Sequence, residues 1–521
     1  MSPLMQASKT ASPNIDTESF RLSAFVELLR REGELEVVQA PTDLIDVAAR
    51  LDGNSKAVLF EKAGPEQASL VGNVMGSRRR MALAFGVSET ALLAEVLQRS
   101  NAPIAPVRIP SSAAPVHQVV LQGDKADLTQ LPVHLQHVED GAPYISAGID
   151  ISRSLDGSKR NVGYRRLMLR GAREAGVDMI APSDFRVMYA DFVARKERMP
   201  VAFVIGSHPA DGVAATAVSS EKDELALMGG LRNAPVPVVQ CVTNDLEVPA
   251  DAEIVLEGYL DEKGWAQPEG PYGEYIGYYG RMKTNPVFHL TAITMRRDAL
   301  FQTITIGGRF LAATDTALLV AVRTETAVWQ ALRNSISAPV AVYATPSSGG
   351  QYSVRVSLRQ RYPGDVRNAI HCVLGSNADV KHVFVVDDDI DVFSDAQMDW
   401  AMATRFQANR DIVQAEGFRT VPLDPSLLGS RTGSKAGFDL TFPFGWQNTR
   451  EYAVPAPPQL KQSKTKQTVR DALAAGPKSF MELMELAGSR DGREIVRELD
   501  ALRREIGLDR ADDGRHKLSK N

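Results

Sequence analysis

The chain contains very little cysteine: among its 521 residues only Cys241 and Cys372 carry a thiol. Two thiols cannot build a disulfide framework, and they cannot form a thiolate metal site. So low a cysteine content fits the reducing cytoplasm, and this is the compartment we expect.

Histidine is sparse as well, and of the eight residues only His134 and His137 lie close together in the sequence. A zinc site is therefore not expected. No G-x-G-x-x-G stretch follows a predicted strand, and no P-loop lysine motif is present. The common nucleotide-binding signatures are thus missing from the sequence.

Long apolar runs are also missing. No stretch reaches the roughly 20 apolar residues that span a bilayer, so no membrane partner is expected. The first residues lack the apolar segment of a signal peptide, and we expect residues 1–16 to be disordered. The net charge of −5 gives no reason to expect binding to nucleic acid.

The length and the sequence patterns predict an α+β, multidomain fold, because 521 residues are too many for one core. Residues 17–115 alternate between helical and strand-like periodicity, which indicates an α/β domain that ends in a proline-rich linker. In this domain Thr42 is a candidate helix N-cap. Residues 116–314 consist mainly of short strand-like runs, typical of a barrel or sandwich. In residues 315–455 helices and strands alternate again, and "HVFVVDDD" is typical of a buried parallel strand.

Residues 456–521 are predicted to form a linker followed by a small helical, winged-helix-like tail. Three short helical stretches precede "LDRADDGRHKLS", which indicates a hairpin. Ser479 and Glu482 have the spacing of a capping box. Because the third helix mixes acidic and basic residues, DNA binding is poorly supported, and we expect a packing or assembly module.

The stretch "QPEGPYGEYIGYYG", residues 267–280, holds two carboxylates, Glu269 and Glu274, around a tight bend. The glycines and the proline between them suit a sharp turn, which can direct both acids toward one cavity. Two acids at such a site can divide their roles, one ionised and the other protonated as a proton donor. The alternative is a surface turn with two solvated acids, because this spacing is common.

Other polar residues stand where a strand pattern does not require them. "RNVGYRR" places Asn161 near Arg165 and Arg166. Arginine offers a planar fork for a carboxylate or phosphate, and an amide oxygen suits Mg²⁺ or Mn²⁺. Glu224 begins a predicted helix, where favourable interaction with the helix dipole is the alternative explanation. The acids of residues 387–391 indicate either a metal site or a strand-end cluster, and their spacing does not decide between them.

With these stretches the chain resembles the UbiD family of reversible (de)carboxylases, which use prenylated FMN. The resemblance rests on "DLEVPADAEIVLEGYL" followed by "PEGPYGEYIGYY", on "RNVGYRR", on "KHVFVVDDDIDVFSDAQMDWAMATRF" and on "GSRTGSKAGFDLT". Weaker support comes from "GNVMGSRRRMALAFG" and "DGAPYISAGIDIS". The order and spacing of these motifs, from about residue 70 to 447, are far more specific than any one motif.

The resemblance implies a catalytic network of Arg166, Glu269 and Glu274 beside the isoalloxazine. Glu274 would protonate the carbon that loses CO₂, Arg166 would orient the substrate carboxylate, and Glu269 would complete the network. The resemblance further implies that the cofactor is bound by Asn161, Val162, Gly163, Tyr164, Arg165, Arg166, Glu224 and Lys381.

The resemblance also implies a divalent metal, Mn²⁺ or Mg²⁺, that bridges the cofactor phosphate, and it allows a potassium ion. Asn161 and Glu224 match two of the family's three ligands. The third is a histidine, and none lies in "IAPSDFRVMYADF", where Asp184 or Ser183 takes its place. Since carboxylates suit Mn²⁺, the expected metal set is Asn161, Asp184 and Glu224. The alternatives are weak metal binding or a phosphate that is held differently.

The activity implied by the resemblance is reversible, non-oxidative decarboxylation of an aromatic, heteroaromatic or α,β-unsaturated carboxylic acid, free or as an aromatic acyl-CoA. A covalent adduct with prenylated FMN would accept the electrons left by CO₂. The implied partners are the acid, CO₂ and a UbiX-type flavin prenyltransferase that supplies the cofactor, and the implied assembly is a homodimer or hexamer.

The implied fold is an N-terminal α/β domain, a central split β-barrel like that of flavin reductases, and a C-terminal α/β dimerisation domain. The loop of residues 305–320 is unlike the proline-containing loop of the family and is expected to shape substrate choice. Two rival interpretations stay open: a two-carboxylate hydrolase or flavin reductase, and a non-catalytic assembly protein. The joint presence of Arg166, Glu269 and Glu274 argues against the assembly protein.

Overall fold

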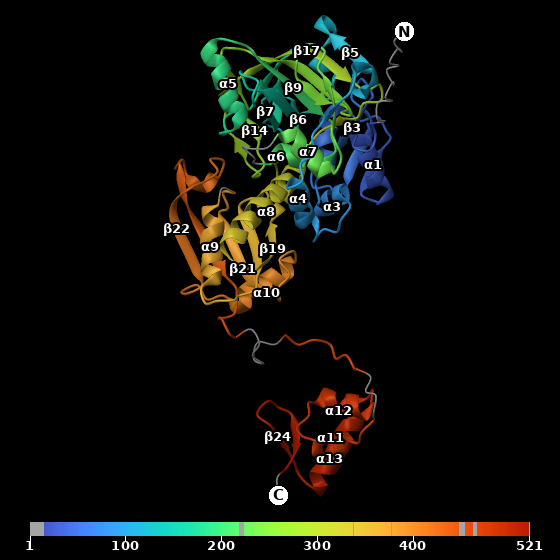
Figure 1. Cartoon of the computed structure of the whole chain (residues 1–521), viewed down its shortest axis with the longest axis vertical. Helices are drawn as coiled ribbons and strands as arrows, with labels where there is room; N and C mark the ends of the chain where they lie inside the picture. The colour runs from blue at the N-terminus through green and yellow to red at the C-terminus, as the bar shows by residue number, and fades with distance from the viewer. Residues whose placement is uncertain are drawn as a thin grey trace, which may run out of the picture. The chain divides into compact units, whose positions relative to one another are not determined.

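The fold was analysed in a computed structural model that describes residues 15–217, 223–336, 338–376, 378–446, 454–461 and 466–519. It divides into two units, residues 1–444 and residues 445–521 (Figure 1). Disorder was predicted for residues 1–16, and residues 1–14 lie outside the described residues. Within the described ranges, no helix is both long and apolar enough to cross a membrane.

The first unit begins with a small α/β region in which the sheet order is β1-β2-β3-β18. The apolar side of α1 packs against β2 and β3, so this helix covers one face of the sheet. Thr42 does not cap α2, because that helix begins at Leu44 and the Thr42 hydroxyl donates to the Ala40 carbonyl instead. The elements are α1 (Leu22–Arg31), β1 (Leu35–Val38), α2 (Leu44–Leu51), β2 (Ala57–Ala63), β3 (Ala68–Gly72), α3 (Arg78–Phe85), α4 (Leu92–Ser100) and β18 (Phe301–Gln302).

The centre of the first unit is a closed antiparallel barrel. Its strands follow the order β12-β9-β6-β7-β8-β17, and β17 pairs with β12 to close the ring. They are β6 (Tyr144–Arg153), β7 (Arg160–Leu169), β8 (Glu174–Val177), β9 (Met199–Ile205), β12 (Ile254–Leu260) and β17 (Val287–Met295), with β5 (Val119–Gln122) added beside β17. The barrel predicted for this part of the chain is thereby confirmed.

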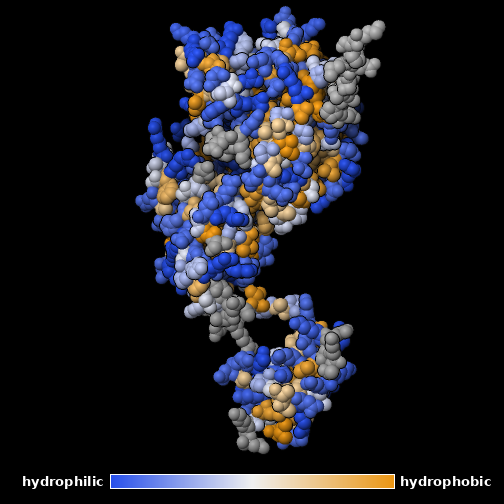
Figure 2. Space-filling model, in the orientation of Figure 1, coloured by the Kyte–Doolittle hydropathy of each residue, from blue (hydrophilic) through white to orange (hydrophobic). Residues whose placement is uncertain are grey.

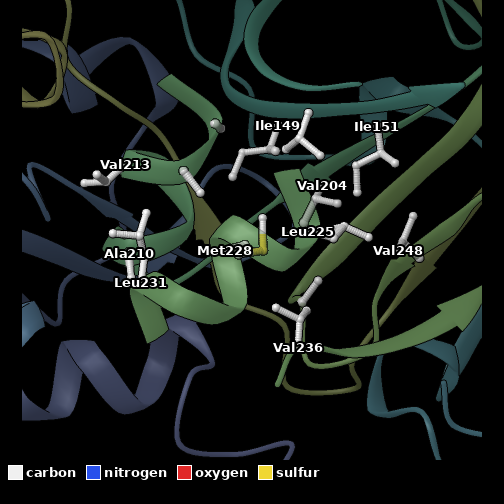
Figure 3. Close-up of a cluster of buried hydrophobic side chains, with 14 of the residues drawn as sticks. Ile149, Ile151, Val204, Ala210, Val213, Leu225, Met228, Leu231, Val236 and Val248 are labelled. Atoms are coloured by element: carbon white, nitrogen blue, oxygen red, sulfur yellow. The ribbon is translucent and has the colours of Figure 1, made fainter. Parts of the chain in front are cut away.

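The barrel strands bury both of their faces, because alternate side chains enter two different apolar clusters. Val201 and Phe203 of β9 belong to one cluster, and Ala202 and Val204 belong to the other. The second cluster receives the helices α6 (Pro209–Thr216) and α7 (Glu224–Arg232), as Figure 3 shows. A buried ion pair locks these two helices together, since Arg232 of α7 contacts Asp211 of α6 at 2.6 Å.

A three-stranded sheet lies next to this helical pair. It consists of β4 (Val107–Arg108), β10 (Pro237–Gln240) and β11 (Glu247–Pro249) in the order β11-β10-β4. The proline-rich stretch predicted as a linker therefore contributes a paired strand. Proline is tolerated there because β4 lies at the edge of the sheet.

The segment between β12 and β17 leaves the barrel and returns to the neighbouring strand. It forms two nested hairpins, in which β13 (Gln267–Glu269) pairs with β16 (Lys283–Asn285) and β14 (Tyr272–Gly273) pairs with β15 (Tyr279–Gly280). We call residues 261–286 the hairpin segment. It contains the two carboxylates of the motif found in the sequence.

The C-terminal part of the first unit is a second α/β region, with the sheet order β19-β20-β21-β23-β22. Strand β21 is parallel to both of its neighbours, which confirms the predicted buried parallel strand. The elements are α8 (Asp315–Ser335), β19 (Pro339–Ala344), β20 (Ser353–Leu358), α9 (Asp365–Gly375), β21 (His382–Asp387), α10 (Asp395–Arg405), β22 (Ile412–Arg419) and β23 (Thr432–Asp439).

The acids that follow β21 form ion pairs within this region. Asp389 contacts Arg405 at 2.7 Å, and Asp388 contacts Arg359 at 2.6 Å. Asp387 accepts the backbone amide of Phe442 at 2.8 Å. Of the two explanations for these acids, the structure therefore favours the strand-end cluster.

The second unit has a core of its own, built by three helices and a hairpin. Ser479 and Glu482 form the predicted capping box at the start of α12. Arginines of α13 pair with acids of the same segment, as Arg504 does with Asp500 at 2.5 Å, and polar and apolar side chains are mixed on the visible face (Figure 2). The elements are α11 (Val469–Ala474), α12 (Phe480–Ala487), α13 (Gly492–Glu505), β24 (Leu508–Arg510) and β25 (His516–Leu518).

Candidate active site

The hairpin segment presents Glu269 and Glu274 from two successive short strands. Glu269 ends β13, where it stands opposite Lys283 of β16, and Glu274 follows β14. Relative exposure is 0% for Glu269 and 6% for Glu274. The alternative of two solvated acids on a surface turn is therefore wrong.

Arg166 of β7 lies between the two carboxylates and pairs with both. Its Nε and Nη2 donate to the two carboxylate oxygens of Glu269 at 3.1 and 3.3 Å. Its Nη1 donates to both oxygens of Glu274 at 3.0 Å. The structure thus brings together the three residues that the sequence places in one network. Burial opposes the charge of Arg166, but the surrounding carboxylates raise its pKa well above the ordinary value.

Three further polar side chains complete this network, and sequence reasoning missed all of them. Asp178, just after β8, lies 3.4 Å from Nη2 of Arg166. Lys283 donates to Oε1 of Glu274 at 3.2 Å and lies 3.8 Å from Asp178. Asn285 donates to Asp178 and to Glu269, at 3.1 Å in each case. Each is a single polar residue in a strand or directly after one, a signal too common to be recognised in the sequence.

The neighbouring charges determine the protonation state of Asp178. Burial tends to raise its pKa, but Arg166 and Lys283 outweigh that effect and hold the pKa below the ordinary value. Asp178 is therefore an anion at neutral pH. The network then combines three carboxyl groups with two cationic side chains in a largely buried place.

Aromatic rings line the other side of Arg166. The centroid of Tyr272 lies 4.4 Å from the Arg166 guanidinium carbon, and that of Tyr144 lies 5.9 Å away. Burial raises the pKa of both phenols, so they are neutral at physiological pH. Stacking on a ring face favours the planar guanidinium and fixes its orientation.

Residues 137–141, which we call the brace loop, hold the hairpin segment in place. Asp140 accepts the backbone amide of Gly273 at 2.9 Å. The Gly141 amide donates to the Pro271 carbonyl at 2.9 Å. A Cβ on Gly273 would lie 2.4 Å from Nδ1 of His137, so only glycine permits this approach. The turn that carries Glu274 is thereby attached to the loop that precedes β6.

A cavity of about 190 Å³ opens beside the network. Arg166, Glu274 and Asp178 line one side of it. The opposite walls are largely apolar and come from three parts of the chain: Met179, Ile180, Ile304, Ile306, Leu319 and Val320. Tyr275 also lines the cavity, and burial raises its pKa to about 12 while its hydroxyl donates to Gln351 at 3.0 Å. The cavity thus combines largely apolar walls with a cationic group, Arg166, at one side.

Family models match most of the first unit. The three domain models of 3-octaprenyl-4-hydroxybenzoate carboxy-lyase match in chain order: the N-terminal model over residues 26–100, the Rift-related model over residues 107–309 and the C-terminal model over residues 317–440. The chain belongs to the UbiD family. It is a carboxy-lyase of the class that uses prenylated FMN.

Solved UbiD-class structures share this fold over nearly their whole length. HmfF from Pelotomaculum thermopropionicum, in complex with FMN, is 31% identical with a TM-score of 0.79, over 84% of this chain and 97% of that one. Vanillic acid decarboxylase from Sedimentibacter hydroxybenzoicus is 28% identical with a TM-score of 0.77, over 86% and 97%. The 3,4-dihydroxybenzoic acid decarboxylase AroY from Klebsiella pneumoniae is 26% identical with a TM-score of 0.78, over 84% and 98%.

HmfF binds flavin in both of its structures, and its evolved dimeric form, 30% identical with a TM-score of 0.75, is in complex with prFMN. Of the residues that the UbiD resemblance assigns to cofactor binding, Tyr164, Arg165 and Arg166 line the cavity from β7. Val162 is buried in the apolar cluster behind the strand, and a Cβ on Gly163 would lie 2.8 Å from Asp150. Three consecutive residues of β7 therefore border the cavity, and Val162 and Gly163 precede them on the same strand.

An acidic cluster lies at the start of β7 and has features of a cation site. Glu224 accepts the Val162 amide at 3.2 Å, next to Asn161, whose amide donates to Asp150 at 2.6 Å. Burial raises the pKa of Glu224 to about 8, and the nearby Asp150, Asp184 and Asp223 add to the effect. Oδ1 of Asp150 is buried and accepts no hydrogen bond, but Nε of Arg165 lies 3.4 Å from it. The oxygens of Asn161 and Glu224 are of the kind that suits a hard divalent metal, whereas Asp150 and Asp223 already pair with Arg165 and Arg160.

The expected metal set is only partly assembled. Asn161 and Glu224 flank the Val162 amide, whereas Asp184 begins α5 (Asp184–Arg195), is exposed and acts on Glu224 electrostatically. Within the described ranges, which omit residues 218–222 just before Glu224, no three His, Cys, Asp or Glu side chains form a metal-type group. Ser183, the other candidate position, caps α5 and accepts from Arg165 at 3.3 Å.

The contacts of the Lys381 ammonium involve none of the other predicted site residues. Lys381 directly precedes β21 in the sequence, and its ammonium donates to Asp424 at 2.6 Å and to Ser426 at 2.7 Å. It lies over the ring of Tyr352 at 5.8 Å. Among the described residues that line the cavity, Lys381 does not appear. Its assignment to the cofactor stays a prediction.

Proposed function

We propose that this UbiD-family enzyme catalyses the reversible, non-oxidative decarboxylation of an aromatic or heteroaromatic carboxylic acid in the cytoplasm. The observation that supports this most directly is the placement of Arg166 between Glu269 and Glu274 at the edge of a largely apolar cavity. Relatives named for 3,4-dihydroxybenzoic acid and vanillic acid favour an aromatic ring. The cavity walls favour the same class, because aromatic acids combine a large apolar surface with one carboxylate.

The chemistry depends on prenylated FMN, which supplies an electron sink for the carbon that loses CO₂. Tyr164, Arg165 and Arg166 would contact it from β7. Asn161, Glu224 and Asp184 would hold a Mn²⁺ or Mg²⁺ ion, which would supply positive charge to offset the cofactor's phosphate. Proton transfer and substrate binding are the tasks of the chain's own side chains.

Arg166 is proposed to orient the substrate carboxylate. In the structure its Nη1 bonds both oxygens of Glu274, so an incoming carboxylate competes with Glu274 for the same donors. Substrate binding would thereby loosen Glu274 from Arg166 and favour its protonation, since a second anion nearby disfavours the charged form. The apolar walls exclude water while this exchange takes place.

Glu274 is the proposed proton donor to the carbon that loses CO₂, and Glu269 is proposed to hold Arg166. Glu269 is fully buried and also accepts from Asn285 at 3.1 Å, so it is fixed in place. Glu274 borders the cavity, whereas Glu269 is not among the described residues that line it. The division of roles follows from this difference.

The proposed partners are a UbiX-type flavin prenyltransferase, which supplies the cofactor, and a second copy of the chain in a homodimer or hexamer. The function is tested by coexpression with such a prenyltransferase, followed by a panel of carboxylic acids. We expect a flavin with the mass of prenylated FMN, CO₂ release from an aromatic or heteroaromatic acid, and uptake of one solvent deuteron at the vacated carbon. Purified enzyme that holds prenylated FMN and releases CO₂ only from aliphatic acids would contradict the proposed substrate class.

A further inference from the structure

Lys283 is the one contact of the Glu274 carboxylate, among the described residues, that can release a proton. Oxygens of Glu274 accept from Arg166 at 3.0 Å and from Lys283 at 3.2 Å. A guanidinium does not deprotonate in proteins, whereas an ammonium group can give up a proton. The two cationic partners of Glu274 therefore differ in what they can do.

Lys283 also connects the buried carboxylate to solvent. The side chain of Glu274 is 7% exposed, and that of Lys283 is 20% exposed. Strand pairing fixes this position, since Lys283 stands opposite Glu269 on β16. A proton taken up from water at Lys283 thus has a direct route to Oε1 of Glu274.

The other groups around Glu274 offer no such route. Asp178 and Glu269 are acids held by Arg166. The hydroxyl of Tyr272 donates to Gln136, and that of Tyr275 donates to Gln351. Tyr144 stacks beside Arg166, and its phenol is neutral and hard to ionise because burial raises its pKa. On the far side of the turn, His137 is bound to Asp140 through Nδ1 at 3.2 Å.

If Glu274 is the proton donor, each turnover leaves it as a carboxylate that must be protonated again. We propose that Lys283 is a positioning residue for Glu274 that returns a solvent proton to this carboxylate after each turnover. The inference rests on the proposed function, because it requires Glu274 to lose its proton to the product.

The step balances without any further reactant. A proton moves from Nζ of Lys283 to Oε1 of Glu274, and the lysine N–H electron pair stays on nitrogen as a neutral amine. The amine then takes a proton from water at the side chain, which is 20% exposed. Asp178 lies 3.8 Å from Nζ, so the nitrogen that is protonated again faces two carboxylates.

The first experiment compares two substitutions of Lys283 in the holoenzyme. Lys283→Met removes the charge and the proton, and Lys283→Arg keeps the charge but cannot release a proton. We expect both variants to bind flavin normally and to lose about 10- to 100-fold in kcat, with KM changed less than about threefold, in line with acid–base contributions. Lys263→Met, at a side chain that is 67% exposed, is the matched control and should keep wild-type kcat.

Chemical rescue supplies the deciding measurement. In Lys283→Ala, added methylamine or ethylamine should restore turnover, and the rescued rate should follow the pKa of the amine. Wild-type kcat in Lys283→Arg, or no rescue by any amine, would overturn the inference. Glu274→Gln is assayed in parallel: full turnover by that variant contradicts the proposed function itself, whereas its inactivity beside a fully active Lys283→Arg contradicts only the role of Lys283.

Discussion

Asp140 accepts the backbone amide of Gly273 at 2.9 Å and so ties the brace loop to the turn that carries Glu274. The same carboxylate accepts the His137 amide at 2.9 Å and the Nδ1 of its ring at 3.2 Å. The side chain of Asp140 is fully buried. One carboxylate outside the Arg166 network thus determines where Glu274 stands.

Asp140→Ala should displace the turn and weaken the fold. Leaving a buried amide without its acceptor costs about 1–3 kcal/mol, and we expect the free energy of unfolding to fall by that amount in urea titrations. A misplaced proton donor should also lower kcat about tenfold or more with little change in KM. Asp124→Ala is the matched control, because this side chain is 98% exposed and its contact with Arg173 is a surface pair. Equal kcat in both variants would show that the turn holds its position without Asp140.

Glu274→Gln should abolish decarboxylation and leave flavin binding intact. Glutamine keeps the size of the side chain and can accept from Arg166, but it delivers no carboxylic proton. We expect kcat to fall by about 10²- to 10⁴-fold, the range of a lost general acid. The measurement is CO₂ release together with the absorbance spectrum of the purified enzyme. A variant without flavin would instead assign Glu274 to cofactor retention.

Asn161→Ala and Glu224→Gln should lose metal and flavin together. Because the pKa of Glu224 is raised to about 8 without a cation, the site must release a proton when metal binds. Mn²⁺ affinity should therefore rise with pH up to about 8 and then level off. Titration of the metal-free protein with Mn²⁺ at several pH values checks this, with Glu66→Gln, at an exposed position, as the control. A flat pH profile for the wild type would argue against Glu224 as a ligand.

Two buried histidines should make the fold sensitive to acid. Burial lowers the pKa of His208 to about 3 and that of His134 to about 4. In the unfolded chain both histidines take up a proton near pH 6.5, whereas in the folded chain they stay neutral. The free energy of unfolding therefore falls as the pH drops below 6.5, by up to about 1.4 kcal/mol per pH unit for each histidine. His208→Asn keeps an acceptor for the Ala210 amide and should flatten the dependence. Thermal melts between pH 4 and 7 measure it, and His371→Asn, at an exposed position, should behave as wild type.

A chain that ends at residue 446 should keep decarboxylase activity. Every residue that lines the cavity lies between residues 146 and 320, and the second unit has a separate core. We expect kcat and KM within about twofold of the full chain, measured with the same acid, because no lining residue is lost. Light scattering of both forms then tests whether the second unit affects assembly. Loss of kcat in the shorter chain without a change in assembly would place a residue of the tail near the chemistry.

Much of this architecture is predictable from the sequence, because the signals are local. The alternation of apolar residues identifies the barrel strands, and "HVFVVDDD" identifies β21. Arg166, Glu269 and Glu274 are found because each lies in a continuous motif. Ser479 and Glu482 show the same advantage, since a capping box needs only four adjacent residues.

The remaining partners depend on strand register, which a single sequence does not reveal. Lys283 reaches Glu274 because β16 pairs with β13, and Asp178 reaches Arg166 because β8 pairs with β7. Asp140 reaches Gly273 across more than a hundred residues of sequence. Thr42 was a plausible cap by residue type, but the chain enters α2 one residue later. The three contacts depend on how distant segments pair, and the cap depends on the residue at which the helix begins.

The hairpin segment starts and ends on neighbouring strands, since β12 and β17 are paired along their length. The β12–β17 pairing therefore closes the barrel without residues 261–286. The segment adds backbone hydrogen bonds to the barrel at its ends, from the Val177 amide to the Pro286 carbonyl and from the Asp261 amide to the Val287 carbonyl. Insertions, deletions or a transplanted version from a relative can enter this segment without reopening the barrel. Natural selection and enzyme engineering can thus exchange the hairpin segment as a unit, provided that its contacts with Arg166 and Asp140 are kept.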